Sequence, residues 1–154
     1  MAKFLSELKV KCCQEDENLW ELEDDLIYES DLLGLTWSAG VVHIPAGFMC
    51  DMASTRHIPL VSLIWGSRAH REGVLHDYLY RINSVPVVSF AMANAVFIEA
   101  MESRAKSFWV RYPMFWGVWL GGYFSYHKKT VEWKPSDKAS CEPPDPTDSE
   151  LVRI

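Results

Sequence analysis

The chain has 154 residues, of which 49% are apolar, enough for one folded domain with a packed core. Its formal net charge of −6 is unevenly spread, because residues 1–55 carry eleven acids against three bases (−8), whereas residues 56–134 carry five acids against ten bases (+5). A surface as acidic as the first third repels phosphates, so we expect no nucleic-acid partner.

The first residues contain no long apolar run, since Glu7 and Lys9 follow Leu5 closely, and we expect the protein to stay in the cytoplasm in which it is made. The four cysteines, at positions 12, 13, 50 and 141, contain no Cys-x-x-Cys pair. Their spacing indicates neither a disulfide framework nor a structural zinc site.

Strands are predicted in the first third of the chain. Apolar and polar residues alternate over 8–12 and 20–23, as they do in half-buried strands, and further strands are predicted over 26–28, 35–37 and 41–44. Gly34 and Gly40 are the expected turn positions. These segments together predict an antiparallel β-meander.

Helices are predicted beyond Pro59. Apolar residues recur every three or four positions from about residue 67 to 82, and a second helix is predicted from about 86 to 105. Asn94 lies on the apolar stripe of the second helix, where a buried amide needs a hydrogen-bond partner. We expect the adjacent residues His76 and Asp77 to supply that partner.

The segment 107–126 contains nine aromatic residues in twenty positions. Its uncharged run over 112–126 has 15 residues, short of the ~20 that a transmembrane helix needs, so we do not expect it to enter a membrane. We expect instead a third helix that packs against the sheet or another subunit. The predicted interface residues are Trp109, Trp116, Trp119, Gly117 and Gly121.

Residues 135–154 are rich in Pro, Ser, Asp and Glu, and this composition does not form a core. We therefore predict a single α+β domain over residues 1–134, in which an N-terminal antiparallel β-meander packs on three C-terminal helices. An extended Pro-rich tail over 135–154 follows, and we expect only a partner to order it.

Two segments place polar groups among apolar neighbours: Pro-Ala-Gly-Phe-Met-Cys-Asp-Met-Ala-Ser over 45–54, and Leu-His-Asp-Tyr-Leu-Tyr over 75–80. In the favoured interpretation Asp51 and Ser54 cap a turn, and His76 bonds to that turn and locks the sheet to the helices. The same residues also fit a hydrolytic site, with Cys50 or Ser54 as nucleophile, His76 as base and Asp51 or Asp77 as the residue that orients it. No metal site is predicted, although a divalent ion at the His-Asp pair stays an alternative.

These two segments resemble the motifs of a family of bacteriophage and prophage proteins, domain of unknown function 1353, over roughly residues 5–126. Two positions depart from the family pattern: Cys50 stands where the family usually has Thr, and Asn94 where a third helix often supplies Asp. The resemblance implies phage origin without a settled activity.

The resemblance, the opposite charges of the two parts of the chain and the aromatic third helix favour a structural or assembly component of a virion, in its tail, baseplate or neck. Its partners would be other phage structural proteins or further copies of itself, first in the host cytoplasm and then in the virion. The first alternative is a hydrolase of peptidoglycan or another envelope polymer that uses the His-Asp site. The second is an early inhibitor that binds a host factor. An enzyme is the less favoured interpretation, and no cofactor is predicted.

Overall fold

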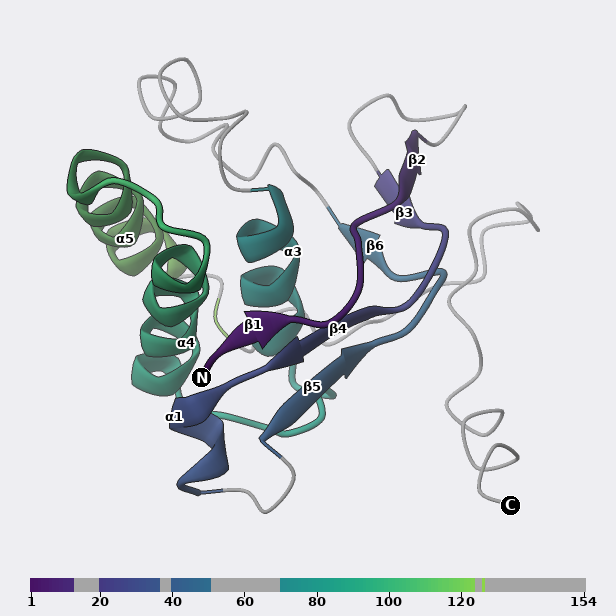
Figure 1. Cartoon of the computed structure of the whole chain (residues 1–154), viewed down its shortest axis with the longest axis horizontal. Helices are drawn as coiled ribbons and strands as arrows, with labels where there is room; N and C mark the ends of the chain where they lie inside the picture. Colours follow the sequence, from purple (N-terminus) through teal and green to yellow (C-terminus); the bar gives the residue numbers. More distant parts are fainter. Residues whose placement is uncertain (13–19, 37–39, 51–69, 124–125, 127–154) are drawn as a thin grey trace.

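The computed structural model describes residues 1–12, 20–36, 40–50, 70–123 and 126 (Figure 1). Asp51, Ser54 and the tail over 135–154 lie outside the described residues. The strands are β1 (Lys3–Phe4), β2 (Val10–Cys12), β3 (Trp20–Leu22), β4 (Leu26–Glu29), β5 (Val41–Ile44) and β6 (Met49–Cys50). The helices are α1 (Asp31–Gly34), α3 (His70–Leu79), α4 (Phe90–Ser103) and α5 (Phe108–Gly122). Strands followed by helices confirm the predicted α+β class.

The strands form two three-stranded antiparallel sheets, in the orders β1-β4-β5 and β2-β3-β6. The pairs β2–β3 and β4–β5 join neighbours in the chain, as in a meander, with Leu26 opposite Ile44 in the second pair. β1 and β6 add the third strand to each sheet. The alternation pattern misses both because two residues do not establish a period.

The strand predicted over 35–37 is wrong at Leu35 and Thr36, which follow α1 and close its last turn. Ser30 begins this helix, because its side chain accepts a hydrogen bond from the backbone N–H of Leu33 at 3.1 Å. The backbone N–H groups of Leu35 and Thr36 then donate to carbonyls three residues earlier. Local capping therefore decides the conformation here, against the strand-forming residue types.

The predicted helices are present, and α4 starts later than expected. It begins at Phe90 because Ser89 caps it, with the Ser89 hydroxyl accepting from the backbone N–H of Met92 at 3.2 Å. α3 is described from His70 onward. None of the helices in the described ranges combines the length and apolar composition that crossing a bilayer requires.

The core lies between the sheet β1-β4-β5 and the helices α3 and α4 (Figure 1). The inward-facing side chains of β4 and β5 are fully buried: Leu26, Tyr28, Val42 and Ile44. α4 contacts α3, α1 and β1, and α5 packs on α4 on the side away from the strands (Figure 1). α5 is therefore the outermost helix, and only Val110 and Gly122 of its residues are buried.

Candidate functional site

A buried polar cluster of His76, Tyr80 and Asn94, which we call the His76 cluster, joins α3 to α4. The Asn94 amide nitrogen donates to the carbonyl of Phe90 at 2.9 Å, which fixes the orientation of the amide. Its oxygen accepts from the Tyr80 hydroxyl at 2.9 Å and lies 3.1 Å from His76 Nε2. Because this oxygen only accepts, Nε2 must carry the proton. The hydrogen bond expected between Asn94 and His76 is thus present.

The imidazole of His76 is only 5% exposed and sits among aromatic rings. Its centroid lies 3.9 Å from that of Tyr80 and 5.0 Å from that of Phe97. Burial raises the pKa of the Tyr80 hydroxyl, which therefore stays protonated and available as a donor. With Nε2 bonded to Asn94, the ring is held by its neighbours in one orientation.

Asp77 takes no part in the contact with Asn94. Adjacent residues of a helix point about 100° apart, and the Asp77 carboxylate lies 3.9 Å from His76 Nδ1, beyond hydrogen-bond distance. The other two predicted members of the site, Asp51 and Ser54, lie outside the described residues. Of the four predicted residues, the structure places His76 in a polar cluster of the core and leaves Asp77 at its margin.

Arg81, which the sequence analysis did not single out, ties the helical layer to the second sheet. Its guanidinium donates to the backbone carbonyl of Met49 at 2.5 Å and lies 4.3 Å from the ring centroid of Phe48. Burial lowers the pKa of this guanidinium, which remains charged because arginine deprotonates only at very high pH. The second sheet and the helices are therefore joined at Met49 of β6, two residues before Asp51 of the predicted acidic turn.

Glu99 makes a second tie that the sequence analysis missed. Its carboxylate accepts from the Tyr28 hydroxyl at 3.0 Å, the Ser30 hydroxyl at 2.6 Å and the backbone N–H of Leu32 at 2.9 Å. Burial, followed by the charge of Glu99, raises the pKa of Tyr28. A signal was present, since Glu99 and Asn94 are the only polar residues of α4 before Glu102.

Glu72 and Arg104 form an ion pair at the other end of the contact between α3 and α4. The Glu72 side chain is fully buried, and the Arg104 guanidinium nitrogen lies 3.3 and 3.4 Å from its two oxygens. A buried carboxylate without such a partner would be strongly destabilising. This pair therefore holds the two helices in register, and its carboxylate and guanidinium are already bonded to each other.

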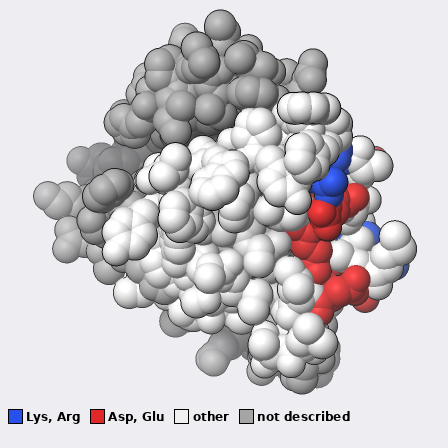
Figure 2. All heavy atoms as spheres, turned by 90° about the vertical axis from the view of Figure 1, so that its left-hand side faces the viewer, with Lys and Arg blue, Asp and Glu red and all other residues white. Residues whose placement is uncertain are grey.

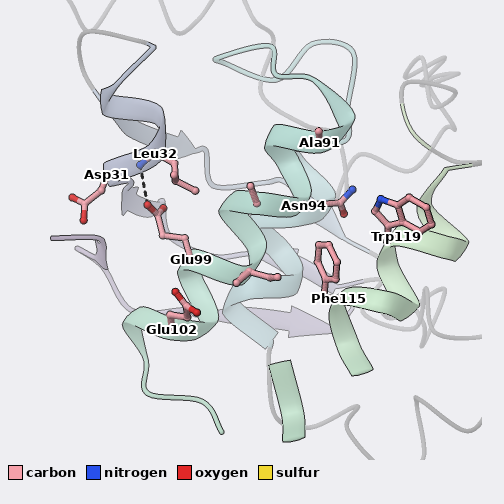
Figure 3. A pocket seen from close by; sticks show the side chains of 10 residues that line it. Asp31, Leu32, Ala91, Asn94, Glu99, Glu102, Phe115 and Trp119 are labelled. Carbon is pink, nitrogen blue, oxygen red and sulfur yellow. Dashed lines mark hydrogen bonds between the residues drawn. The ribbon is translucent and has the colours of Figure 1, made fainter. Parts of the chain in front are cut away.

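A groove of about 600 Å³ opens between α1, α4 and α5 (Figure 3). Asn94 and Trp119 lie close together at one side of it, with Phe115 beside them (Figure 3). Its acidic groups are already paired: Asp31 with the N-terminal ammonium at 2.8 Å, Glu99 with α1 and β4, and Glu102 with Arg111. Among the described residues no group of three or more His, Cys, Asp or Glu side chains is placed to hold a metal ion.

The outer surface of α5 is aromatic and solvent-exposed. Trp109 is 78% exposed, Trp116 53% and Trp119 43%. On a helix with 100° per residue, seven exposed side chains fall within an arc of about 120°, which we call the α5 face: Phe108, Trp109, Tyr112, Trp116, Trp119, Leu120 and Tyr123. Figure 2 shows a broad surface without charge on this side of the molecule, with charged side chains gathered along one edge.

Two of the predicted interface residues, Gly117 and Gly121, lie outside the α5 face. Gly117 and Gly121 fall roughly 60–100° beyond the α5 face around the helix. Gly122 makes a close approach to α3, because a Cβ built there would lie 2.5 Å from the hydroxyl oxygen of Tyr80, which follows that helix. α5 is thereby seated against the His76 cluster through a residue that the spacing argument did not identify.

The fold and these ties define a small α+β protein whose polar residues in the core connect its layers. Residues 20–118 match the family model described as "Protein of unknown function (DUF1353)". The match covers more than half of the chain, and the protein belongs to this family. No curated protein and no solved structure matches the chain.

Proposed function

We propose that this protein is a non-enzymatic assembly component of a bacteriophage virion, in its tail, baseplate or neck, and that the α5 face is its main contact surface. The observation that carries the proposal is the exposed aromatic surface of an outermost helix. Monomeric proteins rarely expose a continuous apolar patch of this kind, whereas protein–protein contact surfaces are enriched in aromatic residues. The phage setting comes from the two sequence motifs over 45–54 and 75–80.

The surroundings of His76 support a structural role for the second motif. A general base must reach the substrate proton, but this imidazole is 5% exposed and its Nε2 is bonded to Asn94. The neighbouring polar residues are occupied as well, Arg81 by the carbonyl of Met49 and Glu72 by Arg104. We infer that the motif Leu-His-Asp-Tyr-Leu-Tyr holds α3 against α4 and β6.

Mass spectrometry of purified virions tests the assembly role. We expect the protein in several copies per particle. The Trp116→Glu variant should be present in fewer copies, because burying the α5 face in a contact would then bury a charge that has no opposite charge beside it. Leu35→Glu is the matched control, since Leu35 is 83% exposed and belongs neither to the α5 face nor to the residues that line the groove. Particles that lack the protein would refute this role and favour an early host-factor inhibitor.

The hydrolase alternative is tested by zymography on peptidoglycan with the full chain and with His76→Ala. If His76 is structural, neither protein clears the substrate and the variant loses stability by about 2–4 kcal/mol, because Asn94 loses a buried donor and a cavity forms. Clearing by the wild-type chain, abolished in a folded His76→Ala variant, would establish a catalytic histidine instead.

A further inference from the structure

We propose that the α5 face, together with the groove beside it, is the interface of a two-fold symmetric dimer of this chain. This inference rests on the proposed function and names the partner that the α5 face takes first. An isologous contact buries the same patch on both subunits, so the patch must contain both a protruding part and a hollow part. The α5 face supplies the protruding part, and the groove between α1, α4 and α5 supplies the hollow part.

The protruding part is the α5 face itself, and it is free of charge. Arg111 is the only charged residue of α5, and on an ideal helix it lies about 60° outside the arc of exposed aromatic residues. Its guanidinium is bonded to the Glu102 carboxylate on α4. Two copies can therefore bring their α5 faces together without burying an unpaired charge on α5, which would be strongly unfavourable.

The hollow part is the groove between α1, α4 and α5, which adjoins the edge of the α5 face. Trp119 belongs to both, because it is one of the exposed aromatic residues and also lines the groove beside Phe115 (Figure 3). Ala91, Asn94 and Ala95 line the α4 side of the groove, and the two alanines fill little of it. Its volume of about 600 Å³ falls in the range of sites that accept bulky organic groups. An aromatic side chain of the second copy is the occupant that fits.

The exposed area is large enough for a stable dimer. Taking about 200 Å² for a fully exposed aromatic or large aliphatic side chain, the exposed fractions of the seven residues leave roughly 800 Å² of apolar surface on the α5 face. A standard interface buries about 800 Å² on each partner. The α5 face thus supplies close to a complete half-interface, and tryptophan is the residue type that contributes most at the centre of such contacts.

A membrane surface is the less fitting occupant. Helices that lie on bilayers combine an apolar side with lysines and arginines that attract anionic headgroups, whereas α5 has one arginine, paired with Glu102, and the chain has a net charge of −6. A second copy needs no basic residues. The observations therefore favour self-association through aromatic contacts.

Sedimentation equilibrium of the full chain over a range of concentrations tests the proposal. We expect a dimer for the wild-type chain and for the control Leu35→Glu. Trp116→Glu, at the centre of the α5 face, should weaken dimerisation roughly 30-fold or more, as expected for a central tryptophan. Circular dichroism and thermal melting establish that each variant is folded before its mass is measured.

A second variant tests the groove without altering α5. Ala91 is an exposed residue of the groove wall, and Ala91→Trp fills the space that the partner's aromatic side chain would occupy. We expect this variant to dissociate as Trp116→Glu does while keeping the wild-type circular dichroism spectrum and a cooperative thermal transition, at the lower melting temperature that loss of the dimer brings. A folded Ala91→Trp protein that dimerises like the wild type would overturn the part assigned to the groove.

Three outcomes separate this inference from the proposed function. A wild-type chain that is monomeric at all concentrations, with virions that still contain it, refutes the dimer and leaves the assembly role standing. A dimer broken by Trp116→Glu, with virions that lack the protein, refutes the assembly role alone. Binding of a monomeric chain to vesicles of phosphatidylserine and phosphatidylcholine, lost in Trp116→Glu, assigns the α5 face to membranes and also refutes the dimer.

Discussion

At the scale of single residues, several buried polar side chains in the described part of the chain are bonded to specific partners across helices. Asn94 is the clearest case, because its amide nitrogen and oxygen together serve the carbonyl of Phe90, the hydroxyl of Tyr80 and Nε2 of His76. Gly122 completes the arrangement by leaving space for the Tyr80 ring. The tyrosine cannot shift freely to admit a larger residue, since its hydroxyl is bonded and the side chain is buried.

Gly122→Ala should therefore destabilise the protein by about 1–3 kcal/mol, because the added Cβ would lie 2.5 Å from the Tyr80 oxygen and 2.7 Å from Cε1. Gly73→Ala is the matched control: its Cβ meets nothing within 4 Å in the middle of α3, so it should gain roughly 0.5–1 kcal/mol from helix propensity. Urea denaturation measures both. Equal stability of the two variants would contradict the close contact at Gly122.

At the scale of elements, the short helix α1 depends on α4 for its position. A four-residue helix has little stability of its own, and α1 is held at its start by the Ser30 cap and by the Glu99 carboxylate. The same carboxylate bonds to Tyr28 of β4. One side chain thus positions a strand and a helix that lie about seventy residues earlier in the chain.

Glu99→Gln should lower the free energy of unfolding by about 1–3 kcal/mol, because one amide oxygen cannot accept from the Tyr28 and Ser30 hydroxyls and the Leu32 N–H together. Glu102→Gln, three residues further along α4, is the control. Its carboxylate is exposed and pairs with Arg111, so the loss should stay below about 1 kcal/mol. Denaturant unfolding measures the free energy of unfolding of both variants, with m-values expected to stay unchanged. Similar decreases in the two variants would count against the hydrogen bonds from Glu99 to α1.

At the scale of the whole molecule, several tyrosine side chains are buried in the core, and folding therefore changes the pKa of their hydroxyls. Burial is the first cause that raises the pKa of Tyr28, of Tyr78 and of Tyr80 above the ordinary value of 10.0. The folded protein therefore keeps these protons at a pH at which the unfolded chain releases them. Their contribution to stability is fully present below about pH 10 and is lost as the pH rises above that value.

We expect the melting temperature to fall steeply above about pH 10, with the tyrosinate absorbance of Tyr28, Tyr78 and Tyr80 appearing together with unfolding. Tyr80→Phe should be less stable at neutral pH, because Asn94 loses a hydrogen-bond donor. Its stability should nevertheless fall less steeply with rising pH, because its unfolding releases up to about one proton fewer than that of the wild type. Melting curves of both proteins across the alkaline range provide the measurement. A tyrosinate absorbance change that appears in the folded wild-type protein and is missing from folded Tyr80→Phe would show that the Tyr80 hydroxyl is not protected by the fold.

The sequence by itself determined the α+β class, the places of the three long helices and the contact between Asn94 and His76. These follow from local periodicity, which states which face of an element is buried and therefore where a polar residue needs a partner. Local periodicity gave the wrong conformation at Leu35 and Thr36, where the Ser30 cap decided it. It also missed the two-residue strands, because two residues are too few to show an alternation.

Only the tertiary structure decided which elements cover those buried faces. The bond from Glu99 to Leu32 of α1 spans 67 positions, and the bond from Arg81 to the carbonyl of Met49 spans 32. The approach of Gly122 to Tyr80 joins α5 to the residue that follows α3. No periodic pattern encodes such pairs, because burial of an apolar stripe is satisfied by any complementary surface, whereas a hydrogen bond or a close backbone contact requires one particular neighbour.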